Sequence, residues 1–199
     1  MTVADPSPAP AGSGDEVDAL ALRRAARGDQ TAARAFFDHY HRLVHAYLWR
    51  MLTPYATRPL VEDLVQDTFL RAFAALPRFV PDGEARVSTW LLTIATRVAL
   101  NELRRKQRKP DATVDVDLVA LPGGKRPDDA AHARAVGRLV ARAVGELPDA
   151  YRAVFVLREY HDRTLDEIAA ALEVPVGTVQ SRLSRARAAL REALQGVQP

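Results

Sequence analysis

The sequence predicts an all-α fold: two small helical domains joined by a flexible linker, with a helix-turn-helix as the C-terminal domain. Apolar residues recur at helical spacing on both sides of residues 109–130, whereas that segment has no periodicity and contains several Pro and Gly. A structureless stretch of this length argues against one compact domain. The predicted domains are therefore residues 17–108 and 131–196, and residues 1–16, rich in Pro and Gly, are expected to form a disordered tail.

Turn and cap residues divide the first domain into four predicted helices. Gly28 and Asp29 end the first helix and cap the second, which is strongly apolar. Pro59 suits the first turn of the third helix, and Ser88 is expected to cap the fourth. The four predicted helices cover residues 18–27, 30–52, 59–76 and 88–108.

Two histidines of the second predicted helix, His41 and His45, lie one turn apart, a spacing that can bind a metal ion. Only Asp38 and His39 stand nearby as further candidate ligands. We therefore interpret both histidines as ordinary residues at the edge of the core, and we expect neither a metal site nor a cofactor.

Acidic and amide side chains gather in the first half of the third predicted helix. They are Glu62, Asp63, Gln66 and Asp67. Carboxylates near a helix N-terminus are favoured by its dipole by roughly 0.3–1 kcal/mol each, and three together can also meet a basic protein partner. No histidine, lysine or nucleophile accompanies them, so the pattern does not favour acid–base or metal catalysis, and an enzyme is not expected.

The fourth predicted helix carries an aromatic residue, a polar stripe and a basic end. Thr93, Thr96, Arg97 and Asn101 follow helical spacing, and six of the residues from 97 to 109 are basic against one acid. Exposed Arg and Asn side chains beside such a cluster can contact bases and phosphates. Trp90 has two interpretations: a core anchor, or a platform on which a base stacks.

The second domain ends in a predicted helix-turn-helix. Thr164 and Glu167 form a capping box for its first helix, and Val174-Pro175 breaks the chain before its second. In that second helix a buried stripe is predicted at Val179, Leu183, Ala186 and Leu190. The opposite face is Ser, Thr and Arg, which suits phosphate contacts and hydrogen bonds to guanine in a major groove. The alternative is a solvated amphipathic helix with no ligand.

Bulk properties restrict the class of protein. The chain has 199 residues, a net charge of only +3 and no cysteine, so nucleic-acid affinity must come from local basic clusters, and disulfides, thiol catalysis and Cys-ligated zinc are excluded. We find no apolar run long enough to span a bilayer and no signal peptide. The expectation is a soluble, cytoplasmic protein without membrane insertion.

Five sequence blocks, in order, resemble the extracytoplasmic-function (ECF) type of bacterial RNA polymerase sigma factor over about residues 18–195. The blocks are D-L-V-Q-D-T-F-L-R-A-F (63–73), S-T-W-L-L-T-I-A (88–95), L-N-E-L-R-R (100–105), L-P-D-A-Y-R-A-V-F-V-L-R (147–158) and D-E-I-A-A-A-L-E-V-P-V-G-T-V-Q-S-R-L-S-R-A-R-A-A-L (166–190). Each block is suggestive by itself, and the five together are highly specific.

The resemblance implies a function and three sets of site residues. The protein would bind core RNA polymerase, through the β′ clamp and the β flap, and direct it to promoter DNA. The residues implied for the clamp contact are Asp63, Leu64, Gln66, Asp67 and Phe69. Those implied for the -10 element are Trp90, Arg97, Asn101, Arg104 and Arg105. Those implied for the -35 element are Thr178, Gln180, Ser181, Arg182, Ser184, Arg185 and Arg187.

The sequence departs from the family at two positions of the -10 set. Arg97 stands where Asn is usual, facing the flipped base, and Asn101 stands where Asp is common. Arg97 can select a base with acceptor groups, or it can add one more phosphate contact. The resemblance also allows a cognate anti-sigma protein, which the sequence does not identify.

Two other classes of protein remain as alternatives. A stand-alone transcriptional regulator would carry the same helix-turn-helix, but it would not need residues 59–109. A DNA-processing enzyme would need an acidic metal triad or a nucleophile, and the sequence offers no credible one.

Overall fold

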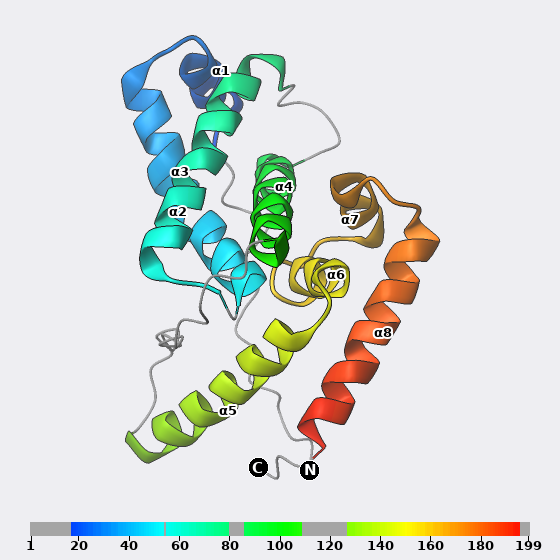
Figure 1. Cartoon of the computed structure of the whole chain (residues 1–199). Helices are drawn as coiled ribbons and strands as arrows, with labels where there is room; N and C mark the ends of the chain where they lie inside the picture. Colours follow the sequence, from blue (N-terminus) through cyan, green and yellow to red (C-terminus); the bar gives the residue numbers. More distant parts are fainter. Residues whose placement is uncertain (1–16, 54, 80–85, 109–126, 196–199) are drawn as a thin grey trace, which may run out of the picture.

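The computed structural model describes residues 17–53, 55–79, 86–108 and 127–195. Every regular element of these residues is helical, which confirms the all-α prediction (Figure 1). The elements are α1 (Ala19–Ala26), α2 (Gln30–Leu52), α3 (Arg58–Ala75), the 3-10 turn η1 (Leu76–Arg78), α4 (Val87–Arg108), α5 (Pro127–Glu146), α6 (Asp149–Glu159), α7 (Leu165–Leu172) and α8 (Val176–Leu194). The tail predicted at 1–16 and most of the predicted linker lie outside the described residues.

Two predictions at helix starts are wrong, the cap at Ser88 and the linker assignment of residues 127–130. Helix α4 begins at Val87, so Ser88 lies in its first turn and does not cap it. Helix α5 begins at Pro127, so residues 127–130 of the predicted linker are helical. Proline suits the first turn of a helix because its missing N–H would have no partner there. The sequence pattern places this proline in the linker because Gly and other Pro precede it.

The first domain is built around α2, which packs against α1, α3 and α4 (Figure 1). The side chain of Asp29 accepts a hydrogen bond from the Ala32 N–H at 3.0 Å, so the predicted cap of α2 is present. Phe36 and Tyr47 are fully buried in the core. The Tyr47 hydroxyl also forms a hydrogen bond of 2.5 Å with the Thr96 hydroxyl, which links α2 to α4.

The second domain comprises α5 to α8, with α8 packed on α5, α6 and α7. The stripe predicted for α8 is confirmed, since Val179, Leu183, Ala186 and Leu190 are all buried. That stripe faces the domain core and leaves the opposite side of α8 to solvent.

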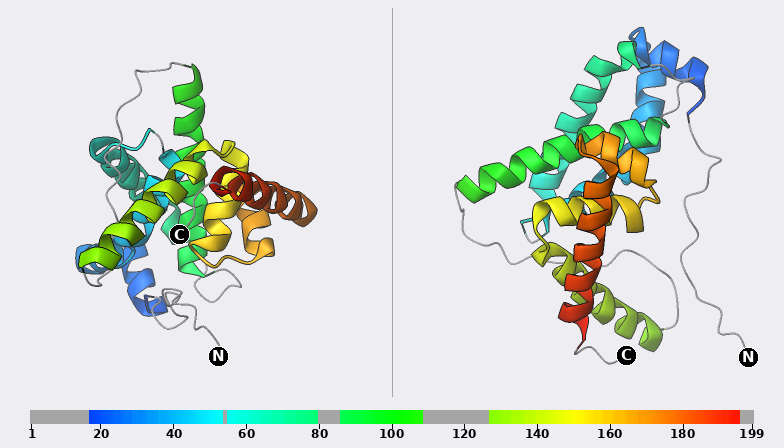
Figure 2. Two further views of the ribbon diagram at one scale, coloured as in Figure 1. Left: turned by 90° about the horizontal axis from the view of Figure 1, so that it is seen from below. Right: turned by 90° about the vertical axis from the view of Figure 1, so that its right-hand side faces the viewer.

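The two domains pack together and share one hydrophobic core. Helix α4 lies against α7, and α2 lies against α5 and α6 (Figure 2). The buried guanidinium of Arg152 donates to the carbonyls of Val144, Gly145 and Leu147 at the end of α5. It also donates to the carbonyl of Met51, at the end of α2, at 2.7 Å. One cation therefore joins the ends of two helices from different domains.

A buried histidine lies at the same interface. The ring of His161, on the turn after α6, meets the ring of Tyr47 edge-on with centroids 5.4 Å apart, and its Nε2 has no hydrogen-bond partner. Burial, reinforced by the nearby positive charges of Arg50 and Arg163, lowers the pKa of His161 to about 3. Arg50 itself is held over the ring of Tyr160, 4.4 Å from its centre. The imidazole is therefore neutral in the folded protein.

We expect the stability of the protein to fall as pH falls below about 6.5, and His161 to account for part of the loss. The unfolded chain protonates this imidazole near pH 6.5, whereas the folded chain does so only near 3, so acid favours the unfolded state between these values. The contribution is about 1.4 kcal/mol per pH unit. Chemical denaturation at several pH values should show a flatter dependence for His161→Phe, which keeps a ring without a titrating group. Identical slopes for the two proteins would contradict this account.

Candidate nucleic-acid and partner-binding surfaces

The outer face of α8 carries every residue predicted for the -35 element. Gln180, Ser181, Ser184, Arg185 and Arg187 are exposed, and Thr178 and Arg182 are half-buried. The Ser181 hydroxyl donates to the carbonyl of Thr178 at 3.0 Å. All seven side chains are thus accessible outside the buried stripe, with Ser181, Ser184 and Arg185 opposite it and Arg187 on its flank.

The arginines of this face differ in their partners within the chain. Arg185 donates to the hydroxyl of Tyr151 at 3.2 Å, and Arg187 donates twice to one oxygen of Glu159. Arg182 has no side-chain partner among the described residues. Exposed contacts of this kind are weak enough for DNA to replace.

The capping box predicted for α7 is present. The hydroxyl of Thr164 accepts from the Glu167 N–H at 3.2 Å, and the Glu167 carboxylate accepts from the Thr164 N–H at 2.7 Å. Burial alone would raise the pKa of Glu167, but hydrogen bonds from Thr164 and Thr89, together with Arg163, hold that pKa below its ordinary value. Helix α7 therefore starts at a fixed point and sets the angle at which α8 leaves the turn.

The turn between α7 and α8 has a feature that the sequence analysis missed. Glu173 closes α7 in the left-handed conformation with φ of 55°, and its N–H bonds back to the carbonyls of Ala169 and Ala170. Glycine is the usual residue at such a position. The Val174-Pro175 break pointed to the end of α7, but nothing in the residue type pointed to this backbone.

Helix α4 presents most of the residues predicted for the -10 element. Arg97, Asn101 and Arg104 are exposed. Trp90 is half-buried, with its ring centroid 4.7 Å from that of Phe79, so it packs on the core and is still partly accessible. Thr96, expected on the polar stripe, is buried instead, because its hydroxyl bonds Tyr47 and the Leu92 carbonyl.

Two arginines of the -10 set are held by carboxylates. Arg105 makes two hydrogen bonds, of 2.7 and 2.8 Å, with Glu102, whose side chain is only 9% exposed. Arg97 is ion-paired with Glu173 of the second domain. Arg104 has no such partner in the described part of the chain, so the positive charge of α4 is most available around it.

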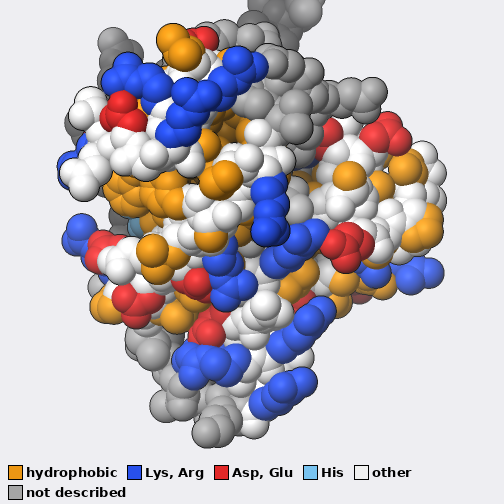
Figure 3. Space-filling view, turned by 90° about the horizontal axis from the view of Figure 1, so that it is seen from above, with side chains coloured by type: hydrophobic (Ala, Val, Ile, Leu, Met, Phe, Trp, Pro, Cys, Tyr) orange, Lys and Arg blue, Asp and Glu red, His pale blue; other side chains and the backbone are white. Residues whose placement is uncertain are grey.

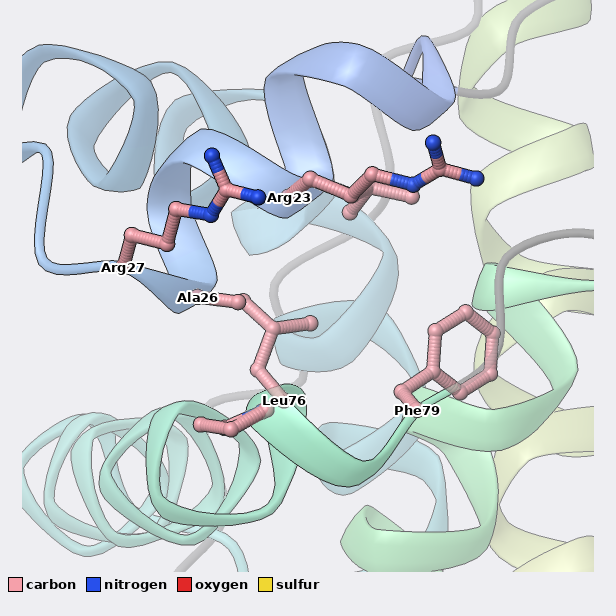
Figure 4. A pocket seen from close by; sticks show the side chains of 7 residues that line it. Arg23, Ala26, Arg27, Leu76 and Phe79 are labelled. Carbon is pink, nitrogen blue, oxygen red and sulfur yellow. The ribbon is translucent and has the colours of Figure 1, made fainter.

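A shallow hollow lies beside Phe79, whose ring packs on that of Trp90. It has a volume of about 200 Å³ and lies between α1 and η1, with Leu22, Leu76 and Phe79 in its wall. The guanidinium groups of Arg23 and Arg27 extend from α1 on one side of the hollow, with Leu76 and Phe79 on the other (Figure 4). Seen from above, this end of the molecule shows Lys and Arg side chains around hydrophobic patches (Figure 3).

The predicted clamp-binding face of α3 is only partly exposed. Asp63 and Gln66 are exposed and have no side-chain partner in the described residues, whereas Asp67 is bound by Arg71 at 2.8 Å. Leu64 is half-buried. Phe69 is 3% exposed, so it supports the helix from the core and does not reach a partner.

Leu70 is a further member of that face which sequence analysis did not select. It is 70% exposed and lies seven residues, about two turns, after Asp63. Helical spacing places Leu70 on the stripe of Asp63 and Gln66, so the sequence alone contains the signal that would find it.

The two histidines with metal-binding spacing lie one turn apart on α2. The rings of His41 and His45 are 6.0 Å apart, and His45 stacks on Trp49. Within the described ranges, no three His, Asp or Glu side chains come together in a way that could hold a metal ion. A bilayer-spanning segment is absent from the helices of the described residues.

Comparison with protein families gives two matches that follow the two domains. The model of Sigma-70 region 2 matches residues 36–109, and that of Sigma-70, region 4 matches residues 137–190. The chain belongs to the ECF sigma factors of RNA polymerase.

Two curated relatives support this assignment. ECF RNA polymerase sigma factor SigW of Bacillus subtilis is 32% identical over 184 residues, 87% of this chain and 95% of SigW. ECF RNA polymerase sigma-E factor of Escherichia coli is 32% identical over 187 residues, 89% of this chain and 94% of the relative.

Two solved structures have the same fold as this sigma factor. CnrH, solved in complex with the cytosolic domain of CnrY, aligns with a TM-score of 0.61 at 28% identity, over 90% of this chain and 97% of CnrH. RpoE from Bartonella quintana, solved with the anti-sigma factor NepR, aligns with a TM-score of 0.63 at 22% identity, over 83% of this chain and 98% of RpoE. Sigma factors are initiation subunits and not enzymes, in agreement with the absence of catalytic chemistry expected from the sequence.

Removal of the α7 cap tests how strongly it positions the helix-turn-helix. We expect Thr164→Ala to lower the free energy of unfolding by about 1 kcal/mol, because the Glu167 N–H loses its acceptor. Thr164→Ser keeps that acceptor and should stay within a few tenths of wild type. Denaturant titration measures both, and equal losses for the two variants would show that the methyl group, and not the cap, is what matters.

Proposed function

We propose that this ECF sigma factor directs core RNA polymerase to promoters through three surfaces: α3 for the polymerase, α4 for the -10 element and α8 for the -35 element. The observation that carries the proposal is the outer face of α8. It is basic, accessible and opposite a fully buried stripe, as a recognition helix in a major groove requires.

On α8 we propose that some residues select bases and that others bind the phosphate backbone of the DNA. Arg185 and Ser181 lie directly opposite the stripe of Val179 and Leu183, so they point into the groove. Arg187 lies on the flank, where a phosphate is the nearer target.

On α4 we propose contacts with the separated strand of the -10 element. Asn101 and Arg104 are exposed, and the half-buried ring of Trp90 packs against that of Phe79. Bases of a single strand stack on aromatic rings whatever their sequence, while arginines follow the phosphates. Arg97, where the family usually has Asn, is proposed either to select the flipped base or to bind its phosphate.

On α3 we propose that Asp63, Gln66 and Asp67 bind a basic surface of the polymerase clamp, with Leu64 and Leu70 as apolar contacts. Asp63 and Gln66 have no side-chain partner among the described residues, so no ion pair has to be broken at these two positions. The β flap would meet the second domain. Because the polymerase acts in the cytoplasm, we propose that location for this protein.

A stand-alone DNA-binding regulator is the second candidate. The helix-turn-helix by itself would suit this regulator as well as it suits a sigma factor. The unpartnered acid and amide of α3, beside the exposed Leu70, favour the sigma factor. An anti-sigma protein remains a further proposed partner, as for the RpoE structure solved with NepR.

The polymerase surface is tested by Asp63→Ala combined with Asp67→Ala. We expect core affinity to fall at least tenfold, about 1.4 kcal/mol, since two charged contacts are lost while the helix persists. Asp38→Ala is the matched control, because it removes an exposed acid from the neighbouring helix α2. Binding to core enzyme by fluorescence anisotropy decides; unchanged affinity in the double variant would remove α3 from the interface.

The -35 surface is tested by comparing Arg185→Ala with Arg187→Ala on duplexes that vary one base pair at a time. We expect Arg185→Ala to cost about 1–3 kcal/mol and to relax specificity at one position, as the loss of a bidentate contact to guanine does. Arg187→Ala should weaken all duplexes alike and reduce the salt slope by about one. A uniform loss for Arg185→Ala would argue against base selection by this residue.

A further inference from the structure

We propose that the second domain closes the -10 surface of this sigma factor, with Glu173 acting as an internal anion that competes with DNA for Arg97. This inference rests on the proposed role of α4 and concerns how that same surface is regulated. It depends on the ion pair that joins Arg97 of α4 to Glu173 of the second domain.

The acidic partner is held in place by the helix-turn-helix itself. Glu173 sits at the left-handed end of α7, with its backbone bonded to the last turn of that helix. Its carboxylate bonds a guanidinium nitrogen of Arg97 from the facing domain. The ion pair therefore exists only while α7 is docked against α4.

Three contacts of the second domain fall on one side of α4. Thr89 donates to Glu167 at 2.7 Å, Arg97 is paired with Glu173, and Gln107 donates to Asp149 at 2.8 Å. At 100° per residue these three positions span an arc of about 80°. Arg104 lies inside this arc and Asn101 just beyond it, so the docked domain and the proposed DNA strand share one face of α4.

Buried contacts supply most of the docking. Arg163 donates to the hydroxyl of Thr89 at 2.6 Å, and Thr89 is only 7% exposed. Arg152 bonds the Met51 carbonyl, and His161 packs on Tyr47. The Arg97 pair is exposed, at 55% and 71% for its two side chains, so it changes the equilibrium by no more than a factor of about five. The role of Glu173 is therefore to compete with DNA for Arg97, and not to hold the domains together.

Separation of the two domains leaves the helices of each intact, but it breaks the contact between Arg152 and the Met51 carbonyl and exposes part of the shared core. Helix α4 ends at Arg108 and α5 begins at Pro127, which leaves 18 residues between them. A chain of that length can reach roughly 60 Å when extended. Separation of α7 from α4 therefore needs no helix to unfold.

The decisive variant is Glu173→Asn, because asparagine accepts the left-handed backbone and removes the charge. The probe is a short fluorescein-labelled single-stranded oligonucleotide of randomised sequence. We expect the full-length variant to bind two- to fivefold more tightly than wild type, with a salt slope steeper by about 0.7, the value of one added phosphate contact on a single strand. Glu146→Gln, which removes an exposed acid from α5, should bind like wild type.

The same measurement in an Arg97→Asn background separates this inference from the proposed function. If Glu173 acts through Arg97, Glu173→Asn has no effect once Arg97 is absent. An equal gain in both backgrounds, or no gain in either, overturns the competition. If Arg97→Asn and Arg104→Ala both leave binding unchanged, the -10 role of α4 fails as well.

Circular dichroism checks that the variant folds, and Glu173→Gly, which also accepts the backbone, replaces it if it does not. Because the chain has no cysteine, Arg34→Cys and Ala188→Cys allow one label on each domain. The label distance should lengthen when the oligonucleotide binds wild type. A distance that stays unchanged at saturating oligonucleotide overturns the closure.

Discussion

The arrangement of the two domains depends on the burial of one guanidinium. Arg152 is 4% exposed, and burial lowers its pKa, with Asp149 and Tyr55 opposing that shift. Its donors are satisfied mainly by backbone carbonyls at the ends of α5 and α2, where helix dipoles favour a cation. A buried charge that lost these acceptors would strongly destabilise the protein. The two domains therefore pack at an angle that lets the carbonyls of both helix ends reach the guanidinium of Arg152.

Much of the fold could be predicted because apolar spacing encodes it directly. The α8 stripe and the cap of α2 follow from local sequence, and the structure contains both. The docking of the domains could not be predicted in this way. Its contacts come from Thr89, Arg152 and Arg163, polar residues that carry no periodic signal and that usually lie at the surface.

Site residues could be predicted where helical spacing alone determines which side chains are exposed. They could not be predicted where tertiary packing determines which side chains are buried. Arg185 is exposed as helical spacing indicated, whereas Thr96 on α4 turned inward to bond Tyr47. Phe69 is buried, whereas Asp63 and Gln66 of the same block are exposed. A family motif mixes residues that contact partners with residues that shape the helix, and only packing separates the two kinds.

The carboxylate of Glu167 serves two structures at once. One oxygen closes the capping box with Thr164, and the other accepts the hydroxyl of Thr89 from the facing domain. A genetic screen for promoter-recognition defects would therefore recover substitutions at this position without any contact between the residue and DNA. Assigning such a phenotype to base recognition would be an error, because helix initiation and domain docking fail together when this single side chain is lost.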